Sequence, residues 1–351
     1  MKKFWKVFGS ILLVVVLLLG AFIAFLSIKE FKPEPIEKVD VVNNENRNNF
    51  SGDVVSVLSY NVGFAGLGDN ADFFMDGGKQ VFATDEKRVE ENFNEIVSNL
   101  KTNEADFYFL QEVDKDSRRT YHFDEVNGFI NDTNLAGVFA MNYSCPFVPY
   151  PVPPLGEINS GLLTLSNSNI ASSERVSLPC PFKWPVSTAN LKRCLLISRV
   201  PVENSDKELV MVNLHLEAYD NGEGKEAQTK MLFSVLQEEY EKGNYVIAGG
   251  DFNQTFPGSL DSYPILNEKT WTPSVLEESI LPEGWTFAYD NNVPSCRLLD
   301  KPYDVNDETA QHYIIDGFIL SPNVETVTVD TLDLGFHAAD HNPVYLNAKL
   351  K

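Results

Sequence analysis

Strand-like and helix-like patterns of apolar residues alternate along most of the chain. Residues 53–60, 106–110 and 245–248 are rich in β-branched and aromatic side chains, which predicts buried strands. Apolar residues that recur every three or four positions predict two helices. Their apolar faces are Val89, Phe93, Ile96, Val97 and Leu100 in one, and Ala227, Met231, Val235, Leu236 and Tyr240 in the other. This alternation is typical of the α/β class.

The most hydrophobic segment lies near the N-terminus. Residues 7–28 form a 22-residue stretch without a charge, and as a helix it would be about 33 Å long, enough to cross a bilayer core. A cleaved signal peptide and a buried core helix are the alternatives. The run exceeds a usual signal h-region and lacks an A-x-A-like cleavage pattern, so we predict an uncleaved transmembrane anchor.

Basic residues set the orientation of this anchor. Lys2, Lys3 and Lys6 precede the span, so the positive-inside rule places residues 1–6 in the cytoplasm and the bulk of the protein outside the cell membrane, in a single-pass topology. Residues 29–50 combine mixed charge, two prolines and an Asn-rich stretch with little apolar surface to bury, which predicts a flexible stalk. Residues 51–351 then form one folded domain.

The chain is strongly acidic. It has 28 basic and 50 acidic side chains among 351 residues, a formal charge of −22, and without the three N-terminal lysines the remainder has 25 basic groups against 50 acidic ones. Such a surface argues against non-specific binding to nucleic acid or anionic lipid by counterion release. A site that meets phosphate through a divalent cation stays open.

The four cysteines show no metal or redox motif. Cys145, Cys180, Cys194 and Cys296 contain no C-x-x-C spacing. An exported domain could oxidise them in pairs, but we favour packed thiols.

Polar side chains follow several of the predicted strands at the point where each strand ends. A helix cap, a turn or a solvated strand end explains any one of them. Several in one chain indicate a site, because strands hold such side chains in fixed positions at the edge of a sheet. The residues are Asn61, Glu112, His215, Asp251, Asn253, Asp316, Asp340 and His341.

These residue types fit the hydrolysis of a phosphate ester. Oxygen ligands from Glu112 and Asn61, with Asp340, suit a hard cation such as Mg²⁺ or Mn²⁺. The cation would neutralise the phosphoryl oxygens and stabilise the leaving oxygen.

The remaining polar residues suit proton transfer and substrate positioning. His341, held by Asp316, would take a proton from the attacking water. Asp251 and Asn253 would position that water or the non-bridging oxygens, and His215 would donate to the phosphate.

The order of the motifs resembles that of the endonuclease/exonuclease/phosphatase superfamily, which includes DNase I-like nucleases and bacterial sphingomyelinases. The resemblance covers about 54–350. It implies a DNase I-like four-layer α/β sandwich, two mixed sheets flanked by helices, with one divalent-metal site. It also implies that Asn159 lies near the substrate phosphate. The motifs are Leu58-Ser59-Tyr60-Asn61, Leu110-Gln111-Glu112, Asn159-Ser160-Gly161-Leu162, Gly250-Asp251-Phe252-Asn253, Ile315-Asp316 and Ala339-Asp340-His341-Asn342-Pro343.

The resemblance favours a membrane-tethered hydrolase of phosphoric ester bonds, most of all a nuclease-like phosphodiesterase. Sphingomyelinase or phospholipid-type activity, inositol-phosphate phosphatase activity, and a non-catalytic outward-facing binding module on the same fold are the alternatives. The substrate would be a nucleic acid, a phospholipid headgroup or a small phosphodiester, and no obligate protein partner is evident.

Three irregular segments could choose among these substrates. Residues 63–78 are rich in Gly and Phe, and 146–154 and 179–185 combine several prolines with Phe, Tyr or Trp. They are either rigid surface loops or an aromatic rim that receives the substrate. Arg88, Lys192 and Arg193 could add positive charge near that rim.

Overall fold

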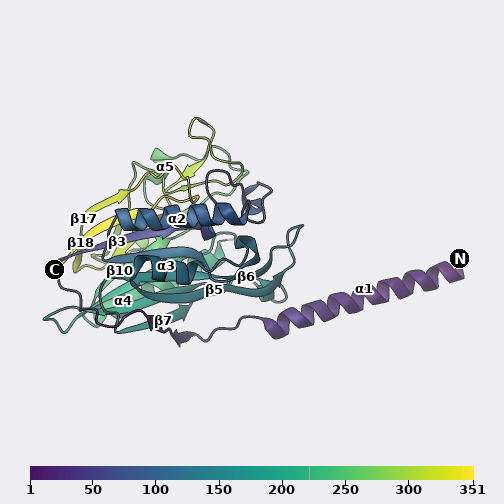
Figure 1. Cartoon of the computed structure of the whole chain (residues 1–351), viewed down its shortest axis with the longest axis horizontal. Helices are drawn as coiled ribbons and strands as arrows, with labels where there is room; N and C mark the ends of the chain where they lie inside the picture. The colour runs from purple at the N-terminus through teal and green to yellow at the C-terminus, as the bar shows by residue number, and fades with distance from the viewer. Residues whose placement is uncertain (221) are drawn as a thin grey trace.

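Two mixed β-sheets pack face to face in the computed structural model of the chain, which describes residues 1–220 and 222–351 (Figure 1). Within these residues each sheet has seven strands. Sheet 1 contains, in spatial order, β1 (Ile36–Lys38), β7 (Ser172–Ser177), β8 (Cys194–Pro201), β9 (Glu208–His215), β10 (Tyr245–Asp251), β16 (Asp316–Leu320) and β13 (Thr286–Ala288). Sheet 2 contains β17 (Val324–Thr331), β18 (Val344–Leu350), β3 (Val54–Asn61), β4 (Phe107–Asp114), β6 (Gly156–Ser166), β5 (Ala136–Val148) and β2 (Val41–Val42).

Helices cover the outer face of each sheet, so the predicted four-layer sandwich is confirmed. Helices α2 (Glu86–Thr102) and α3 (Glu125–Thr133) pack on sheet 2, and α4 (Glu223–Glu241) packs on sheet 1. The connections after β10 hold a short helix and two small strand pairs: α5 (Ser259–Ser262), β11 (Gln254–Thr255) with β12 (Ser274–Val275), and β14 (Cys296–Arg297) with β15 (His312–Tyr313).

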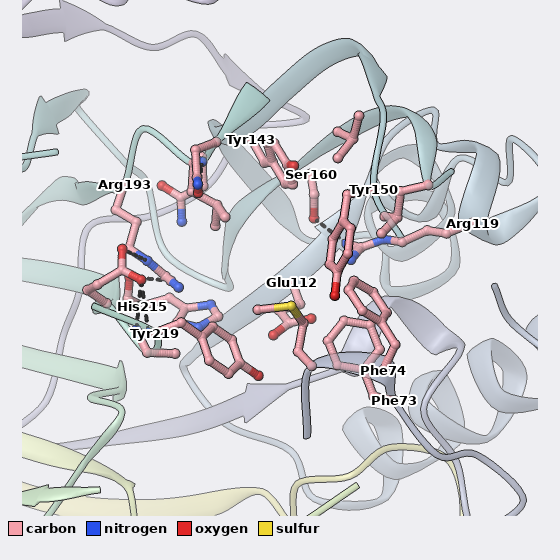
Figure 2. A pocket seen from close by; sticks show the side chains of 18 of the residues that line it. Phe73, Phe74, Glu112, Arg119, Tyr143, Tyr150, Ser160, Arg193, His215 and Tyr219 are labelled. Atoms are coloured by element: carbon pink, nitrogen blue, oxygen red, sulfur yellow. Dashed lines mark hydrogen bonds and ion pairs between the residues drawn. The ribbon is translucent and has the colours of Figure 1, made fainter. Parts of the chain in front are cut away.

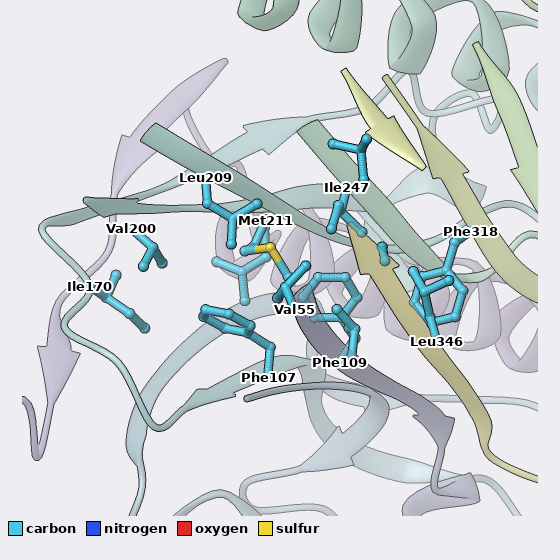
Figure 3. Packing of buried hydrophobic residues seen from close by; sticks show 14 of the residues in the cluster. Val55, Phe107, Phe109, Ile170, Val200, Leu209, Met211, Ile247, Phe318 and Leu346 are labelled. Carbon is cyan, nitrogen blue, oxygen red and sulfur yellow. The ribbon is translucent and has the colours of Figure 1, made fainter. Parts of the chain in front are cut away.

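The inner faces of the two sheets form the largest part of the core. Phe107 and Phe109 of β4 lie against Leu209 and Met211 of β9, and all four side chains are fully buried (Figure 3). Alternate residues of each strand point inward because side chains alternate between the two faces of a sheet. This packing fixes the two sheets relative to each other, and with them the strand ends that carry the site.

The predicted helix faces are confirmed for α2 and partly wrong for α4. All five apolar residues predicted for α2 are buried. In α4 the buried face centres on Gln228, Leu232 and Leu236, while Met231 and Val235 are only half-buried at its flank. Gln228 is buried because its side chain bonds the Glu217 amide and the Pro179 carbonyl. Apolar periodicity cannot detect a buried polar residue whose partners lie elsewhere in the chain.

The flexible stalk predicted over 29–50 is wrong for most of that segment. Residues 36–38 pair with β7 as an edge strand of sheet 1, and Val41–Val42 pair with β5 at the edge of sheet 2. Asn44 donates to the Ile170 carbonyl, and Phe50 is buried in the core between the sheets. Polar asparagines bind the domain's backbone here, an interaction that composition does not reveal. The folded domain therefore includes residues 36–50.

The N-terminal apolar segment forms α1 (Lys2–Lys29), a helix long and apolar enough to cross a membrane. It projects from the domain, with the N-terminus far from the sandwich (Figure 1). Its first five turns are exposed, whereas Leu26 in the last turns is buried with Cys145, Val148 and Ile158 of the domain. One end of α1 is thus part of the folded domain.

The cysteines are free thiols in the described structure, and Cys145, Cys194 and Cys296 are buried. Burial raises the pKa of Cys194 and of Cys296 to about 12. A thiol with so high a pKa has almost no thiolate at neutral pH, so these two behave as packed side chains.

Truncation of the inter-sheet core should destabilise the whole domain. Phe109→Ala removes a fully buried ring between the sheets, and we expect it to lower the free energy of unfolding by about 3–5 kcal/mol. Urea unfolding of the full chain, followed by tryptophan fluorescence, measures the change. Val327→Ala on exposed β17 is the control and should stay within about 0.5 kcal/mol of the parent. Equal effects of both changes would contradict this view of the core.

Candidate active site

Strand register brings the predicted residues of sheet 1 to one edge. β9 and β10 run parallel with His215 opposite Asp251, and β16 runs antiparallel to β10 with Asp316 opposite the same Asp251. Asn253 follows two residues later, where its backbone amide donates to Asp251 Oδ1 at 2.8 Å. The four predicted residues of this sheet therefore lie side by side.

The residues of sheet 2 reach the same place from the other layer. Asn61 ends β3 beside Gln111 of β4, and Asp340 and His341 precede β18. Glu112 lies in a β-bulge of β4, where the pairing with β6 shifts register, and its φ is +57°. Side chains of a regular strand alternate between the two faces of the sheet. A bulge interrupts this alternation and turns the side chain in a new direction, at a cost in backbone strain. Glu112 thereby points into a cavity (Figure 2).

Asn61 links the two sheets at the floor of this cavity. Its Nδ2 lies 3.0 Å from Asp251 Oδ2, 3.3 Å from Glu112 Oε1 and 3.4 Å from His341 Nε2. Its Oδ1 accepts from the Gly63 amide at 3.0 Å, which leaves one lone pair of that oxygen for another ligand. A single amide thus donates to two carboxylates, those of Asp251 and Glu112, and lies beside the His341 ring.

Asp340 has the features expected of a cation ligand. Its carboxyl is buried, and Oδ1 accepts no hydrogen bond from any described residue. Burial raises the pKa of Asp340 to about 7, and repulsion from Glu112 adds to this effect. A Cβ atom on Gly63 would lie only 2.7 Å from Oδ1, so glycine keeps the space beside this oxygen open. Buried Asp340 and half-buried Glu112 repel each other, and such a pair of oxygen donors with an unused lone pair fits a hard divalent cation.

His341 and Asp316 form a buried pair. His341 Nδ1 lies 2.8 Å from Asp316 Oδ2, which also accepts from Ser295 Oγ at 2.8 Å. Burial alone would lower the pKa of His341, but the negative charges of Asp316 and Asp340 and the hydrogen bond to Asp316 outweigh it and raise this pKa well above its ordinary value. With Nδ1 held by Asp316, the Nε2 atom faces Asp251 Oδ2 at 3.8 Å.

The other predicted imidazole has the opposite charge state. His215 Nε2 lies 3.5 Å from Asp251 Oδ2. Burial, with the nearby charge of Arg193, lowers the pKa of His215 well below its ordinary value, so the ring is neutral at pH 7. Burial and the neighbouring Asp316 raise the pKa of Asp251 to about 7.

Asn159 does not join the cluster. Its amide bonds the Asp116 carbonyl at 2.9 Å, and its Oδ1 accepts from Ser144 at 2.8 Å. The adjacent Ser160 lines the cavity, whereas Asn159 is not among the lining residues in the described part of the chain. Neighbouring residues of a strand point to opposite faces, so the expected phosphate contact of Asn159 is wrong in this structure.

Two buried arginines lie on the cavity wall (Figure 2). The sequence indicates Arg193, which donates to Glu217 at 3.3 Å and to the His215 carbonyl at 3.1 Å. Arg119 was not predicted; it makes a bidentate pair with Asp114 at 2.8 and 3.0 Å and stacks 3.6 Å from the Phe64 ring. In the sequence, an Asp and an Arg at this spacing look like any exposed ion pair. Only the burial of both side chains in the folded chain shows that Arg119 belongs to the cavity.

The other predicted basic residues lie elsewhere. Arg88 pairs with Asp69 at 2.6 Å and is not among the described residues that line the cavity. Lys192 pairs at 3.0 Å with Glu30, just after α1.

Comparison with known proteins supports the same fold. A model of the endonuclease/exonuclease/phosphatase family matches residues 58–341. The structure is similar to an endonuclease/exonuclease/phosphatase from Beutenbergia cavernae DSM 12333 (TM-score 0.59, 15% identity, 85% of this chain and 72% of that one). It is also similar to the human Nocturnin catalytic domain with bound sulfate (TM-score 0.53, 15% identity, 89% and 97%). A third similar structure is a functionally unknown conserved protein from Enterococcus faecalis V583 (TM-score 0.54, 13% identity, 84% and 100%). No curated protein sequence matches.

Cation binding at this site should be coupled to protons. Asp251 and Asp340 have pKa values of about 7 in the folded chain against about 3.9 unfolded, so without a cation these carboxyls cost stability as pH rises through 7. A bound cation offsets that cost. We therefore expect MgCl₂ to raise the melting temperature more at pH 8 than at pH 5, measured by circular dichroism against chelator.

Two controls accompany this measurement. NaCl of equal ionic strength should give no such pH-dependent rise, and Asp340→Asn should abolish most of it. An equal rise at both pH values in the parent chain would show that no proton is displaced.

Proposed function

This chain belongs to the endonuclease/exonuclease/phosphatase family, and on that premise we propose that it is a divalent-cation-dependent hydrolase that cleaves phosphodiesters with water. Members of this family hydrolyse phosphoesters. The observation that carries the proposal is the convergence of Glu112, Asp251, Asp340 and the His341–Asp316 pair on one cavity floor. None of Glu112, Asp251, Asp340 and His341 is lost from the family-like motifs, which disfavours a binding module without catalysis.

Glu112, Asn61 and Asp340 are the proposed ligands of Mg²⁺ or Mn²⁺. When bound, the cation would supply charge neutralisation at the phosphoryl and leaving oxygens. The unused lone pair of Asp340 Oδ1 and the bulge that aims Glu112 support this assignment.

His341 is the proposed proton acceptor for the attacking water. Asp316 fixes the proton on Nδ1 and leaves Nε2 facing Asp251. The negative charge of Asp340 is one of the causes that raise the pKa of His341. A cation bound to Asp340 would offset that charge and lower the pKa of His341 toward neutral pH, where a general base works best. Asp251 and Asn253 would position the water.

Neutral His215 and the two buried arginines would bind the phosphate. A neutral imidazole has one N–H to donate and does not compete for the cation's charge. Arg119 and Arg193 both line the cavity, on opposite sides of Glu112 in Figure 2, and a guanidinium can pair with phosphoryl oxygens. Which ester is cleaved then depends on the rest of the wall.

We further propose that α1 is an uncleaved membrane anchor, with residues 1–6 in the cytoplasm and the catalytic domain on the other side. Its charge-free stretch and the three preceding lysines support the orientation. Its buried Leu26 supports retention, because cleavage of the helix would remove part of the domain's packing. The proposed units are residues 1–6, the anchor at 7–28 and the catalytic domain from about 36 to 351.

Removal of the proposed base should abolish turnover. We expect His341→Ala to lower kcat for Mg²⁺-dependent hydrolysis of bis(4-nitrophenyl) phosphate by about 10²- to 10⁴-fold, the usual contribution of a general base. His122→Ala is the matched control, because His122 also pairs with a carboxylate, that of Asp116, but is exposed. Retention of most activity in His341→Ala would exclude His341 as the base.

Removal of a proposed ligand should abolish cation binding. We expect Glu112→Gln to weaken Mg²⁺ binding by at least about tenfold in isothermal titration calorimetry, since one anionic ligand is lost. Glu157→Gln, on the exposed face of β6, controls for the change in net charge. If the parent chain binds no Mg²⁺ and hydrolyses no phosphodiester, the proposed function is wrong.

A further inference from the structure

The membrane helix forms part of the wall of the catalytic cavity. Leu19, Phe22, Ile23 and Leu26 of α1 line the same cavity as Glu112 and His341. The cavity has a volume of about 660 Å³, within the range of sites for small molecules. A helix that served only as a tether would need no contact with the site.

The contact between α1 and the domain is specific. The Phe22 ring packs edge-on against Phe147, with centroids 5.9 Å apart. Trp184 Nε1 donates to Ser27 Oγ at 2.9 Å, and Glu30 pairs with Lys192 at 3.0 Å. These interactions orient the cavity relative to the helix axis, and therefore relative to a bilayer that the helix crosses.

The length of α1 places the cavity wall at the membrane surface. A bilayer core takes about 20 helical residues, so a span that begins at Val7 ends near Leu26. The wall residues of α1 then occupy the last two turns of the span, at the outer edge of the hydrocarbon. The cavity opens where lipid chains meet their headgroups.

Two loops beside α1 expose apolar and aromatic side chains. These are the proline-rich segments 146–154 and 179–185 of the sequence. Val152 is 93% exposed and Trp184 is 65% exposed, and Tyr150 and Val186 are also exposed. Tyrosine and tryptophan are typical of the membrane–water interface. The same loops lie next to the helix that would enter the bilayer, which explains exposed apolar groups that are costly in water.

The cavity runs from an apolar part beside α1 to a polar part at the proposed cation site. Phe74, Val148 and Leu155 line it within the apolar cluster that contains Leu26 of α1, whereas Glu112, His215 and Asp340 line its polar part. This gradient matches a phospholipid, whose phosphate joins a polar headgroup to apolar chains. It does not match a nucleic acid duplex, which needs an open basic surface, whereas this chain has a formal charge of −22.

We propose that the substrate is a phospholipid of the membrane in which α1 lies. The lipid enters between α1 and the two aromatic loops, its phosphoester reaches Glu112 and His341, and its chains stay in the bilayer along Leu19 and Ile23. Water adds to phosphorus, the P–O bond to one substituent breaks, and the released alcohol takes a proton. This inference rests on the proposed function and on α1 crossing the membrane.

The test compares a membrane substrate with a soluble one. The full chain is reconstituted in vesicles of phosphatidylcholine, phosphatidylethanolamine, phosphatidylglycerol and sphingomyelin in equal parts, with Mg²⁺. Mass spectrometry of the aqueous phase and the lipid detects the products. Bis(4-nitrophenyl) phosphate and supercoiled plasmid are the soluble substrates. We expect vesicle lipid to be hydrolysed faster than plasmid DNA, per phosphodiester, by at least about tenfold, as expected for a substrate already concentrated at the site.

Neighbouring leucines of α1 supply a matched pair of variants. Both Leu18 and Leu19 are exposed, but of the two only Leu19 is among the described residues that line the cavity. Both changes to Gln alter helix propensity and span hydrophobicity equally. Leu19→Gln should lower the ratio of vesicle to bis(4-nitrophenyl) phosphate turnover by about fivefold, because apolar contact with the lipid chain is lost. Leu18→Gln should leave that ratio within about twofold, as expected for a change that removes no such contact.

The outcomes separate the two proposals. Hydrolysis of bis(4-nitrophenyl) phosphate without hydrolysis of vesicle lipid would overturn the lipid inference and leave the proposed function intact. No hydrolysis of any substrate would overturn the proposed function itself. Equal ratios for the Leu18 and Leu19 variants would overturn the route along α1, and faster cleavage of plasmid would identify a nuclease.

Discussion

Repulsion among buried carboxylates is the constraint on which the rest of this structure depends. Buried Asp251, Asp316 and Asp340 meet half-buried Glu112 where the two sheets end. Buried charges of one sign are costly unless they are paired or bonded. Two interactions reduce this repulsion. The Asn61 amide donates to both Glu112 and Asp251, and protonated His341 pairs with Asp316. One carboxylate oxygen of Asp340 is left over, which is where a cation would complete the balance of charge.

Holding these groups requires two sheets that cannot slide. Phe107 and Phe109 interlock with sheet 1, and beside the site Gln111 of β4 donates to Asn213 of β9 at 2.8 Å. Within sheet 1 the backbones of β9 and β10 also approach closely, because a Cβ on Gly250 would lie 1.9 Å from the Leu214 carbonyl oxygen. A shift of one strand would separate donors and acceptors that now lie within hydrogen-bond distance. The packing of the apolar core therefore fixes the distances between the polar groups of the site.

The N-terminal segments are part of the folded domain and reach the candidate site. Residues 36–50 bind the edges of both sheets, and the last turns of α1 complete the wall of the cavity. Under the proposed membrane anchor, this continuity links the position of α1 in the bilayer to access to the proposed catalytic site. Under the proposed function, the helix acts as a guide for substrate as well as an anchor.

The sequence by itself determined the α/β class, the existence and approximate start of β3, β4 and β10, the buried face of α2, and most of the residues that meet in the cavity. It could do so because strand and helix periodicities are local, and because carboxylates, amides and imidazoles at strand ends report chemistry directly. The tertiary structure decided the rest. It excluded Asn159, which points away from the cavity, added Arg119, and replaced the expected stalk with two edge strands. It also placed α1 against the site. Each of these depends on which segments distant in the chain pack together, and no local pattern carries that information.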